Sequence, residues 1–278
     1  MQKADIRTQW ENAAPGWARW EATVATWMEP ATELMLTMAG VAPGASVLDL
    51  ASGAGSQTLQ AARRVGVQGH VVASDIADTM LHHVRENARA AGLNNVTTLA
   101  GAAEDLDVVA ESFDAVICRL GLMLFAAPAK ALAALRRALR PGGKVGLVVF
   151  TTPAANPFMA QPMQILLRHA GKMPPPQGQP GIFALGAPGM LERLLVDGGF
   201  VNVQQCAVAL ALAMPSAAHA STMMQEAFGA YRAVVSDSPE SVRAAAWIEV
   251  AEKLKAFETP TGFVAAAEVL VAGGMKPS

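Results

Sequence analysis

The chain has 278 residues, which is enough for a sizeable hydrophobic core in one or two domains. Hydrophobic residues make up 52% and charged residues 16%. The long apolar run at 116–135 is nevertheless interrupted by Arg119, Pro128 and Lys130, which argues against a membrane-spanning helix of about 20 apolar residues. A net charge of −2 without a basic cluster argues against a nucleic-acid partner.

The first predicted element is an N-terminal helical arm that carries four of the five tryptophans, namely Trp10, Trp17, Trp20 and Trp27. Their separations of seven, three and seven residues keep them on one broad face of a helix, even if Pro15 and Gly16 bend it. The arm has charges of both signs and no apolar core, so we expect neither a secretory signal nor a transit peptide.

From about residue 30 to residue 150, short β-branched runs alternate with helical patterns, which is typical of βαβ units and a parallel sheet. Strands are expected at 46–50, 70–74, 96–99, 113–118 and 144–150. Helices are expected at 56–65, 77–91 and 127–139, and the turn at 141–143 is expected to start the fifth strand. Right-handed crossovers then give a doubly wound sheet, with a ligand crevice at the carboxyl ends of its strands.

After residue 150 a proline-rich excursion with a short helix near 163–170 is expected to pass over the sheet. The remaining predicted elements are a helix at 187–197, a strand at 200–213, helical stretches at 217–235 and 238–257, and a strand at 263–272. The sequence thus predicts an α/β fold with a mostly parallel, seven-stranded sheet and a helical insertion before the last strand. The expected organisation is an arm or lid at 1–29 and one domain at 30–278, with covering segments at about 151–186 and 215–257.

The two cysteines, Cys118 and Cys206, both lie in apolar runs that we expect to be buried strands. Two buried thiols form neither a disulfide framework nor a multi-cysteine metal site. We therefore expect a cytoplasmic protein without a bound metal.

The most informative stretch is the strand and turn at 47–56, VLDLASGAGS. Gly53 and Gly55 allow positive φ and let the backbone approach a ligand at a helix N-terminus. A dinucleotide and S-adenosylmethionine are the two competing ligands. Asp49 would repel a pyrophosphate but attract the ammonium of a methionine group, and Thr58 stands where the dinucleotide fingerprint has its third glycine. The loop therefore favours S-adenosylmethionine.

Asp75 ends the second predicted strand, 20 residues beyond Gly55, where a carboxylate can accept hydrogen bonds from ribose hydroxyls. Asp78 offers the better N-cap for the next helix, which leaves Asp75 for a ligand. Ile76 and Met80 are placed either to cover an adenine face or simply to pack the helix.

Five segments occur in the order and spacing of the motifs of class I S-adenosylmethionine-dependent methyltransferases: VLDLASGAGSQTL, VVASDIADTML, GAAEDLD, FDAVICRLGLMLF and LRRALRPGGKVGLVVF. The set most resembles the group that includes the ubiquinone and menaquinone biosynthesis C-methyltransferases, over about half of the chain. The resemblance implies a Rossmann-like methyltransferase fold. It also implies S-adenosyl-L-methionine as the methyl donor, with S-adenosyl-L-homocysteine as the product.

The resemblance further implies which residues surround this cofactor. They are Asp49, Ala51, Gly53 and Gly55 at the methionine end, Asp75 at the ribose, Ala102 and Ala103 at the adenine edge, and Cys118 and Arg119 on the sulfonium side. The family usually has an aspartate where Ala102 stands. The contact to the adenine amino group would therefore fall to backbone, to Glu104 or Asp105, or to water.

Methyl transfer from a sulfonium chiefly requires alignment of the acceptor and exclusion of water. No Asp/His or Tyr/His pair stands out as a general base. The candidates in the covering segments are His169 and Tyr231, although each is more often a surface or packing residue. Arg119 is placed to face the cofactor carboxylate or an acceptor oxygen, because a charge beside the core needs a partner.

The four N-terminal tryptophans either pack on the sheet domain or form an aromatic wall over a planar substrate. We therefore expect methyl transfer to a small, largely apolar molecule, aromatic or quinoid in character. The alternatives are an NAD(P)-dependent Rossmann oxidoreductase and a non-catalytic nucleoside-binding protein. A homodimer is an open alternative to a monomer.

Overall fold

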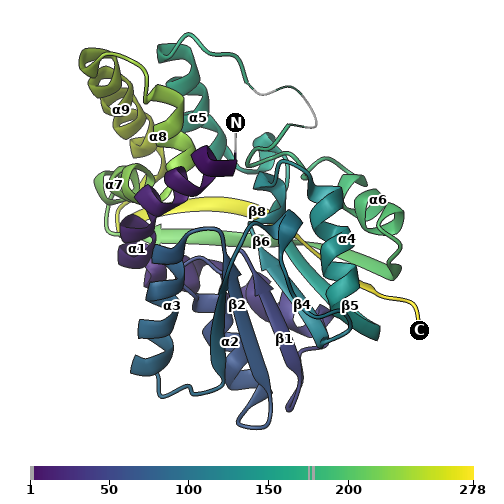
Figure 1. The fold of residues 1–278 in the computed structure, drawn as a ribbon. Coiled ribbons are helices and arrows are strands. Elements are labelled where there is room, and N and C mark those ends of the chain that lie inside the picture. The colour runs from purple at the N-terminus through teal and green to yellow at the C-terminus, as the bar shows by residue number, and fades with distance from the viewer. Residues whose placement is uncertain (1–2, 175, 177–178) are drawn as a thin grey trace.

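The computed structural model describes residues 3–174, 176 and 179–278, and it contains one mixed sheet with helices on both faces (Figure 1). The sheet order is β3-β2-β1-β4-β5-β8-β6, and the short β7 pairs with β8. All pairs among β1 to β5 are parallel, whereas β8 is antiparallel to both β5 and β6. The predicted mostly parallel, seven-stranded α/β sheet is confirmed, with β7 as an unpredicted addition. Residues 1–2 of the expected arm and residues 175, 177 and 178 of the proline-rich excursion lie outside the described residues.

The strands are β1 (Ser46–Leu50), β2 (His70–Asp75), β3 (Val96–Ala100), β4 (Phe113–Arg119), β5 (Leu139–Phe150), β6 (Val201–Met214), β7 (Glu258–Thr259) and β8 (Gly262–Met275). The helices are α1 (Lys3–Met38), α2 (Ser56–Val65), α3 (Asp78–Ala90), α4 (Pro128–Ala138), α5 (Pro157–His169), α6 (Met190–Asp197), α7 (Ala217–Ala227), α8 (Gly229–Val235) and α9 (Glu240–Leu254). None of these described helices combines the length and apolarity needed to cross a membrane.

Most predicted elements lie within a few residues of their expected bounds, and the differences have local causes. The fifth strand begins at Leu139 instead of 144, because Leu139 is extended and pairs with Phe113 before an irregularity in the register. The helix expected at 163–170 starts earlier, with Pro157 at its first turn, a position where the missing N–H costs no hydrogen bond. The helical stretch at 217–235 is divided at Phe228.

The first helix is longer than the expected arm. It continues through Pro15 and Pro30 as one element, so the expected boundary at residues 29 and 30 falls inside α1. The C-terminal half of α1 packs closely on the sheet. The approach is so close that a Cβ on Gly146 of β5 would lie 2.6 Å from the carbonyl oxygen of Met35. The N-terminal half reaches the helices beyond the sheet.

The helices form two layers and a separate cap. Helices α1, α2 and α3 pack against one another on one face, while α4 and α6 lie on the other face (Figure 1). Helices α5, α7, α8 and α9 pack together beyond β6 and β8, and we call this group the helical cap. The central strands β1 and β4 are almost fully buried because both faces of the sheet are covered.

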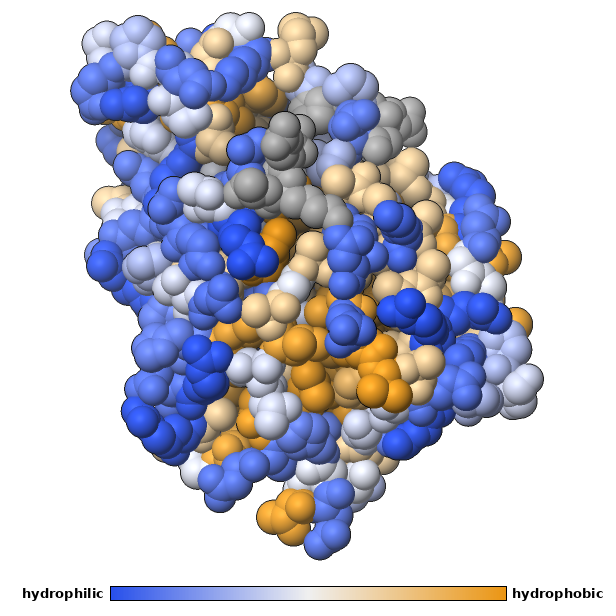
Figure 2. Space-filling model, viewed as in Figure 1, coloured by the Kyte–Doolittle hydropathy of each residue, from blue (hydrophilic) through white to orange (hydrophobic). Residues whose placement is uncertain are grey.

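Cys206 does not lie in a buried strand, so that expectation was wrong. It is exposed on β6, the last strand of the sheet order, whose first half is uncovered on both faces. Cys118 is buried on β4 as expected. Apolar residues also reach the surface elsewhere: Figure 2 shows them gathered in the middle of one face, between α3 and α4, with hydrophilic residues around them. The many apolar residues of the chain therefore lie both in the core and on parts of the surface.

The close approach of α1 to the helical cap can be tested at Gly16. A Cβ on this residue would lie 1.9 Å from the backbone oxygen of Glu226 in α7. We expect Gly16→Ala to lower the free energy of unfolding by about 1–3 kcal/mol through overpacking, although alanine alone favours a helix by about 1 kcal/mol. Urea unfolding followed by circular dichroism measures the change. The matched control is Gly181→Ala, where a Cβ meets no atom within 4 Å. Equal stability of the Gly16 variant and the wild type would contradict the importance of this contact for docking α1.

Candidate functional site

A cavity of about 200 Å³ lies at the carboxyl ends of the parallel strands, where a doubly wound sheet binds its ligands. One wall is formed by the turns that follow β1, β2, β3 and β4, and the other by α1 with parts of α5 and α8. The predicted site residues that line it are Trp10, Trp17, Trp27, Ala51, Gly53, Asp75, Ile76, Met80, Ala102, Ala103, Arg119 and Tyr231. The cavity therefore brings the N-terminal helix together with the glycine-containing turn.

The turn after β1 has the backbone that its glycines predict. Gly53 and Gly55 have φ of 55° and 103°, and Ala51 also has positive φ, at 54°. At Gly55 a Cβ would in addition lie 3.1 Å from Cγ2 of Val84 on α3. Gly55 is therefore required both by its conformation and by the packing of the two helices.

Asp49 lies beneath this turn and not on the cavity wall. Its side chain is fully buried, and its carboxylate accepts hydrogen bonds from Thr58 Oγ1 at 2.5 Å and from Gln57 Nε2 at 3.4 Å. Burial raises the pKa of Asp49 to about 7, although these hydrogen bonds and the charge of Arg119 lower it. Gln57 lines the cavity and thus lies between the carboxylate and the cavity space.

Asp75 lies on the cavity wall and is fixed by backbone N–H groups. Its two carboxylate oxygens accept hydrogen bonds from Gly53 and Ala77, each at 3.0 Å. Burial raises the pKa of Asp75, while these hydrogen bonds lower it. The backbone N–H of Ile76 also contributes to lowering this pKa, and a carboxylate with about four acceptor positions can accept a further donor. The side-chain hydroxyls of Ser52 and Ser74, which belong to lining residues, are buried and have no partner among the described residues.

The expectation that Asp78 caps α3 was wrong. Asp78 is the first helical residue, and the N–H groups of Asp78 and Thr79 donate to the carboxylate of Glu11, at 2.7 and 3.1 Å. A carboxylate from α1 therefore supplies the cap that we expected from the local sequence. Ala77 precedes the helix and donates its N–H to Asp75, as a turn between β2 and α3 requires.

Glu21 of α1 makes the corresponding contact at α2. Its Oε1 accepts the backbone N–H of Ser56 at 2.5 Å, and Glu21 lines the cavity. Glu11 and Glu21 were not predicted as site residues. The signal was present, because each is an acidic residue directly after a tryptophan on the apolar face of α1.

Arg119, at the end of β4, is a buried cation on the cavity wall. It is 7% exposed, and its guanidinium donates to the hydroxyls of Thr32 at 3.0 Å and Ser56 at 2.6 Å. Burial lowers the pKa of Arg119, whereas the charges of Glu21 and Asp49 raise it. Both hydrogen-bond partners are neutral, so Glu21 and Asp49 balance the charge of Arg119 through space, and an anion in the cavity would add a direct partner.

The predicted adenine-edge residues line the cavity, whereas Cys118 lies behind its wall. The Cys118 thiol is buried outside the lining, and burial raises its pKa to about 12, so it remains protonated. Ala102 and Ala103 line the cavity together with Glu104, whose Oε1 accepts the N–H of Ala127 at 3.4 Å. Asp105 is not part of this lining.

The tryptophans of α1 do not all face the cavity. Trp10, Trp17 and Trp27 line it, and Trp17 packs on Phe228 of the helical cap with ring centroids 5.9 Å apart. Trp20 is outside the lining, and its indole N–H donates to Glu226 at 2.7 Å. The predicted aromatic face is therefore divided between a cavity wall and a contact with α7.

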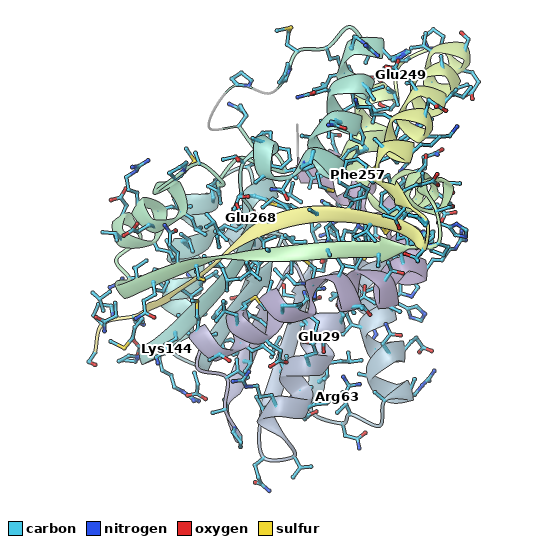
Figure 3. The ribbon with its side chains drawn as sticks, turned by 180° about the vertical axis from the view of Figure 1, so that it is seen from behind. Glu29, Arg63, Lys144, Glu249, Phe257 and Glu268 are labelled. Carbon is cyan, nitrogen blue, oxygen red and sulfur yellow. The ribbon has the colours of Figure 1, made fainter. Side chains whose placement is uncertain are left out.

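Both residues considered as general bases in the covering segments are engaged with other groups of the chain. Tyr231 lines the cavity, but its hydroxyl donates to the backbone oxygen of Met159 at 2.8 Å, and burial raises its pKa. His169 is not part of the lining and pairs with Glu249 at 2.8 Å. Figure 3 shows Glu249 at the outer end of the helical cap, away from the sheet. In the described part of the chain, no group of three or more His, Cys, Asp or Glu side chains is arranged to hold a metal ion.

Comparisons with known proteins point to one family. Residues 47–143 match a family model described as a methyltransferase domain. The nocamycin O-methyltransferase of Saccharothrix syringae is 31% identical over 210 residues, which cover 71% of this chain and 74% of that protein. The ubiquinone/menaquinone biosynthesis C-methyltransferase UbiE of Idiomarina loihiensis is 39% identical over 117 residues, which cover 42% of this chain and 47% of that protein.

A solved structure extends the similarity to nearly the whole chain. The YcgJ protein from Bacillus subtilis has a TM-score of 0.61 at 16% identity, over 90% of this chain and 99% of that chain, which shows a shared fold. In sequence, however, the chain spans about half the length of the C-methyltransferase relatives that it matches.

The buried carboxyl of Asp49 makes stability depend on pH. Its pKa is higher in the fold, at about 7, than the ordinary value of 3.8. The protonated form therefore stabilises the fold below the ordinary pKa, and this contribution is lost as the pH rises through about 7. We expect Asp49→Asn to gain stability relative to the wild type between about pH 4 and about pH 8, by about 1 kcal/mol per pH unit.

Urea unfolding of both proteins across this range measures the difference. Other titrating groups are shared by the two proteins and largely cancel. A difference that does not change with pH would show that Asp49 is ionised throughout.

Proposed function

The chain belongs to the class I S-adenosylmethionine-dependent methyltransferases, as its five motifs predicted, and from this we propose that it methylates a small, largely apolar molecule with S-adenosylmethionine as donor. One observation supports this most: a single cavity joins the glycine-containing turn, Asp75 and the buried cation Arg119 to a wall of tryptophans. The first three features suit a nucleoside that carries an amino acid, and the last suits an apolar partner beside it.

The polar groups of the cavity fit the cofactor's chemistry. The ribose hydroxyls would donate to Asp75, whose carboxylate is already oriented by Gly53 and Ala77. The unpaired hydroxyls of Ser52 and Ser74 lie on this side and would gain partners from a polar ligand. Because Ala102 has no polar side chain, Glu104 on the same wall is the side chain proposed to accept from the adenine amino group.

The charges at the other end fit an amino-acid zwitterion. Arg119 would hold its carboxylate, because its guanidinium offers N–H donors in a desolvated setting. Asp49, beneath the turn, would favour its ammonium through space or through Gln57. A bound ammonium would in turn favour the ionised form of Asp49.

When bound, the cofactor would supply an activated methyl group on a sulfonium. The chain's own contribution is then to hold the acceptor in line and to exclude water. The wall formed by Trp27, Phe150 and Met159 is apolar and suits exclusion of water. Tyr231 is unsuited to act as a base, because its hydroxyl donates a hydrogen bond to the backbone oxygen of Met159 and burial opposes its ionisation. The acceptor would then have to be acidic enough to lose its proton to solvent, and its ionised form would be the nucleophile.

The proposed acceptor is aromatic or quinoid, and one relative supports this choice by name, a ubiquinone/menaquinone biosynthesis C-methyltransferase. Another relative is a nocamycin O-methyltransferase. Carbon and oxygen are therefore both candidate accepting atoms. The tryptophans of α1 support a flat apolar substrate, because large aromatic surfaces stack well on such rings.

We expect the protein to bind S-adenosylhomocysteine but neither NAD nor NADP in isothermal titration calorimetry. The sheet supports this choice, because β8 is inserted antiparallel between β5 and β6, unlike the all-parallel dinucleotide-binding order.

Binding of S-adenosylhomocysteine should tighten as the pH rises through about 7, since ionised Asp49 attracts the ligand ammonium. Asp49→Asn should weaken binding by about 1–3 kcal/mol and remove this pH dependence.

The two alternatives predict different outcomes. Binding of NAD or NADP without S-adenosylhomocysteine would indicate an oxidoreductase. Binding of S-adenosylhomocysteine without transfer of labelled methyl to a broad panel of phenols, quinols, amines and thiols would indicate a non-catalytic nucleoside-binding protein.

The role of Arg119 can be separated from that of the nucleoside site. We expect Arg119→Met to weaken S-adenosylhomocysteine binding about 10- to 100-fold, the range for hydrogen bonds to a charged group. The control ligand is 5′-methylthioadenosine, which lacks the carboxylate, and its affinity should change by less than about threefold. If both ligands weakened equally, Arg119 would support the fold of the site instead of binding the carboxylate.

A further inference from the structure

Two indole N–H groups in the cavity wall have no hydrogen-bond partner. They belong to Trp17 and Trp27, and both nitrogens are buried, with no acceptor among the described residues. Other polar groups near them are satisfied: Trp20 donates to Glu226, and Tyr231 donates to Met159. Among the described residues that line the cavity, the buried side-chain donors without a partner are these two indoles and, beside Asp75, the hydroxyls of Ser52 and Ser74.

A buried N–H without a partner costs stability, and packing alone does not require one at position 27. Trp27 is 4% exposed and lies between Phe150 and Phe158, with ring centroids 5.9 and 6.2 Å away. A phenylalanine would also provide an apolar ring among these side chains, without a buried N–H. The indole nitrogen at this position therefore calls for a partner from outside the chain.

Trp27 lies where it would contact the methyl acceptor and not the nucleoside of the cofactor. Its neighbour Phe150 ends β5, whereas Asp75 ends β2, and β1 and β4 separate these two strands in the sheet. Trp27 thus lies in the half of the cavity away from the proposed ribose site. Trp17 is less informative, because it packs both near Met80 on the nucleoside side and against Phe228.

An indole N–H only donates, so its partner must be an accepting atom. We propose that Trp27 donates a hydrogen bond to a carbonyl or hydroxyl oxygen of the acceptor, and so selects oxygen-bearing substrates among flat apolar ones. This proposal rests on the proposed methyltransferase function and specifies its substrate class. Trp27 Nε1 is covered in this structure, so an oxygen reaches it by displacing neighbouring atoms. Met123 and Met159, which also line the cavity, have flexible side chains, so parts of this wall can adapt to a ligand.

The test compares two bicyclic probes of similar shape, 1-indanone with a carbonyl oxygen and indane without one. With saturating S-adenosylhomocysteine, calorimetry should show that the wild type binds indanone more tightly than indane. Trp27→Phe should reduce this preference about five- to tenfold, as expected for one hydrogen bond. Trp247→Phe, a tryptophan of α9 outside the cavity lining, is the matched control and should keep the preference.

A second measurement uses the unaltered protein and does not depend on folding of the variant. In protein labelled with ¹⁵N at the indole nitrogens, indanone should shift the Trp27 N–H resonance downfield, and indane should not. The resonance of Trp20 should stay in place, because its N–H is already bonded to Glu226.

The outcomes separate this proposal from the one on which it rests. Failure of the wild type to bind S-adenosylhomocysteine would remove the proposed function and this proposal together. If S-adenosylhomocysteine binds, the assignment of Trp27 alone is overturned by any of three results: no preference for indanone in the wild type, including binding of neither probe; an unchanged preference in Trp27→Phe; or an unmoved Trp27 resonance.

Discussion

Two carboxylates on one long helix hold the ends of the helices that frame the cavity. Glu11 accepts N–H groups at the start of α3, and Glu21 accepts the N–H of Ser56 at the start of α2. Helix N-termini have unpaired N–H groups and a partial positive charge, so both contacts are electrostatically favourable. Because the same helix carries the tryptophan wall, the cavity exists only while α1 is docked. Its shape and the burial of Arg119, which donates to Thr32 of this helix, both depend on this docking.

The charges around the cavity form a sparse and mostly desolvated set. Arg119 is bonded to two hydroxyls, while Glu21 and Asp49 act on it through space. Low dielectric strengthens each of these interactions and makes an unmatched charge costly. A zwitterion placed here would meet Arg119 at its carboxylate and Asp49 at its ammonium, whereas a neutral molecule would leave the guanidinium with its two hydroxyl partners and the through-space charges of Glu21 and Asp49. The electrostatics and the apolar wall thus favour two different kinds of ligand in one space.

Local patterns predicted much of the fold, because strands buried on both faces and helices that end at glycines leave strong signals. The same local reasoning identified Gly53, Asp75 and Arg119 as lining residues. It was less successful where distant segments interact. Asp78 seemed to be a helix cap, but the cap comes from Glu11, 67 residues away in the sequence. Likewise, nothing in the alternation around Cys206 showed that its strand ends the sheet, with the first half of the strand exposed on both faces. Such features depend on which elements meet, and a single sequence does not specify that directly.

The crowding of tryptophans on α1 has an optical consequence. Four of the five indoles belong to this helix, and the fifth, Trp247, belongs to α9. Tyr231 is the chain's single tyrosine. The intrinsic near-ultraviolet emission of the protein therefore arises mainly from one element, and three of its sources line the cavity. Emission colour and quenching should consequently report on the surroundings of α1 and say little about the sheet beneath it.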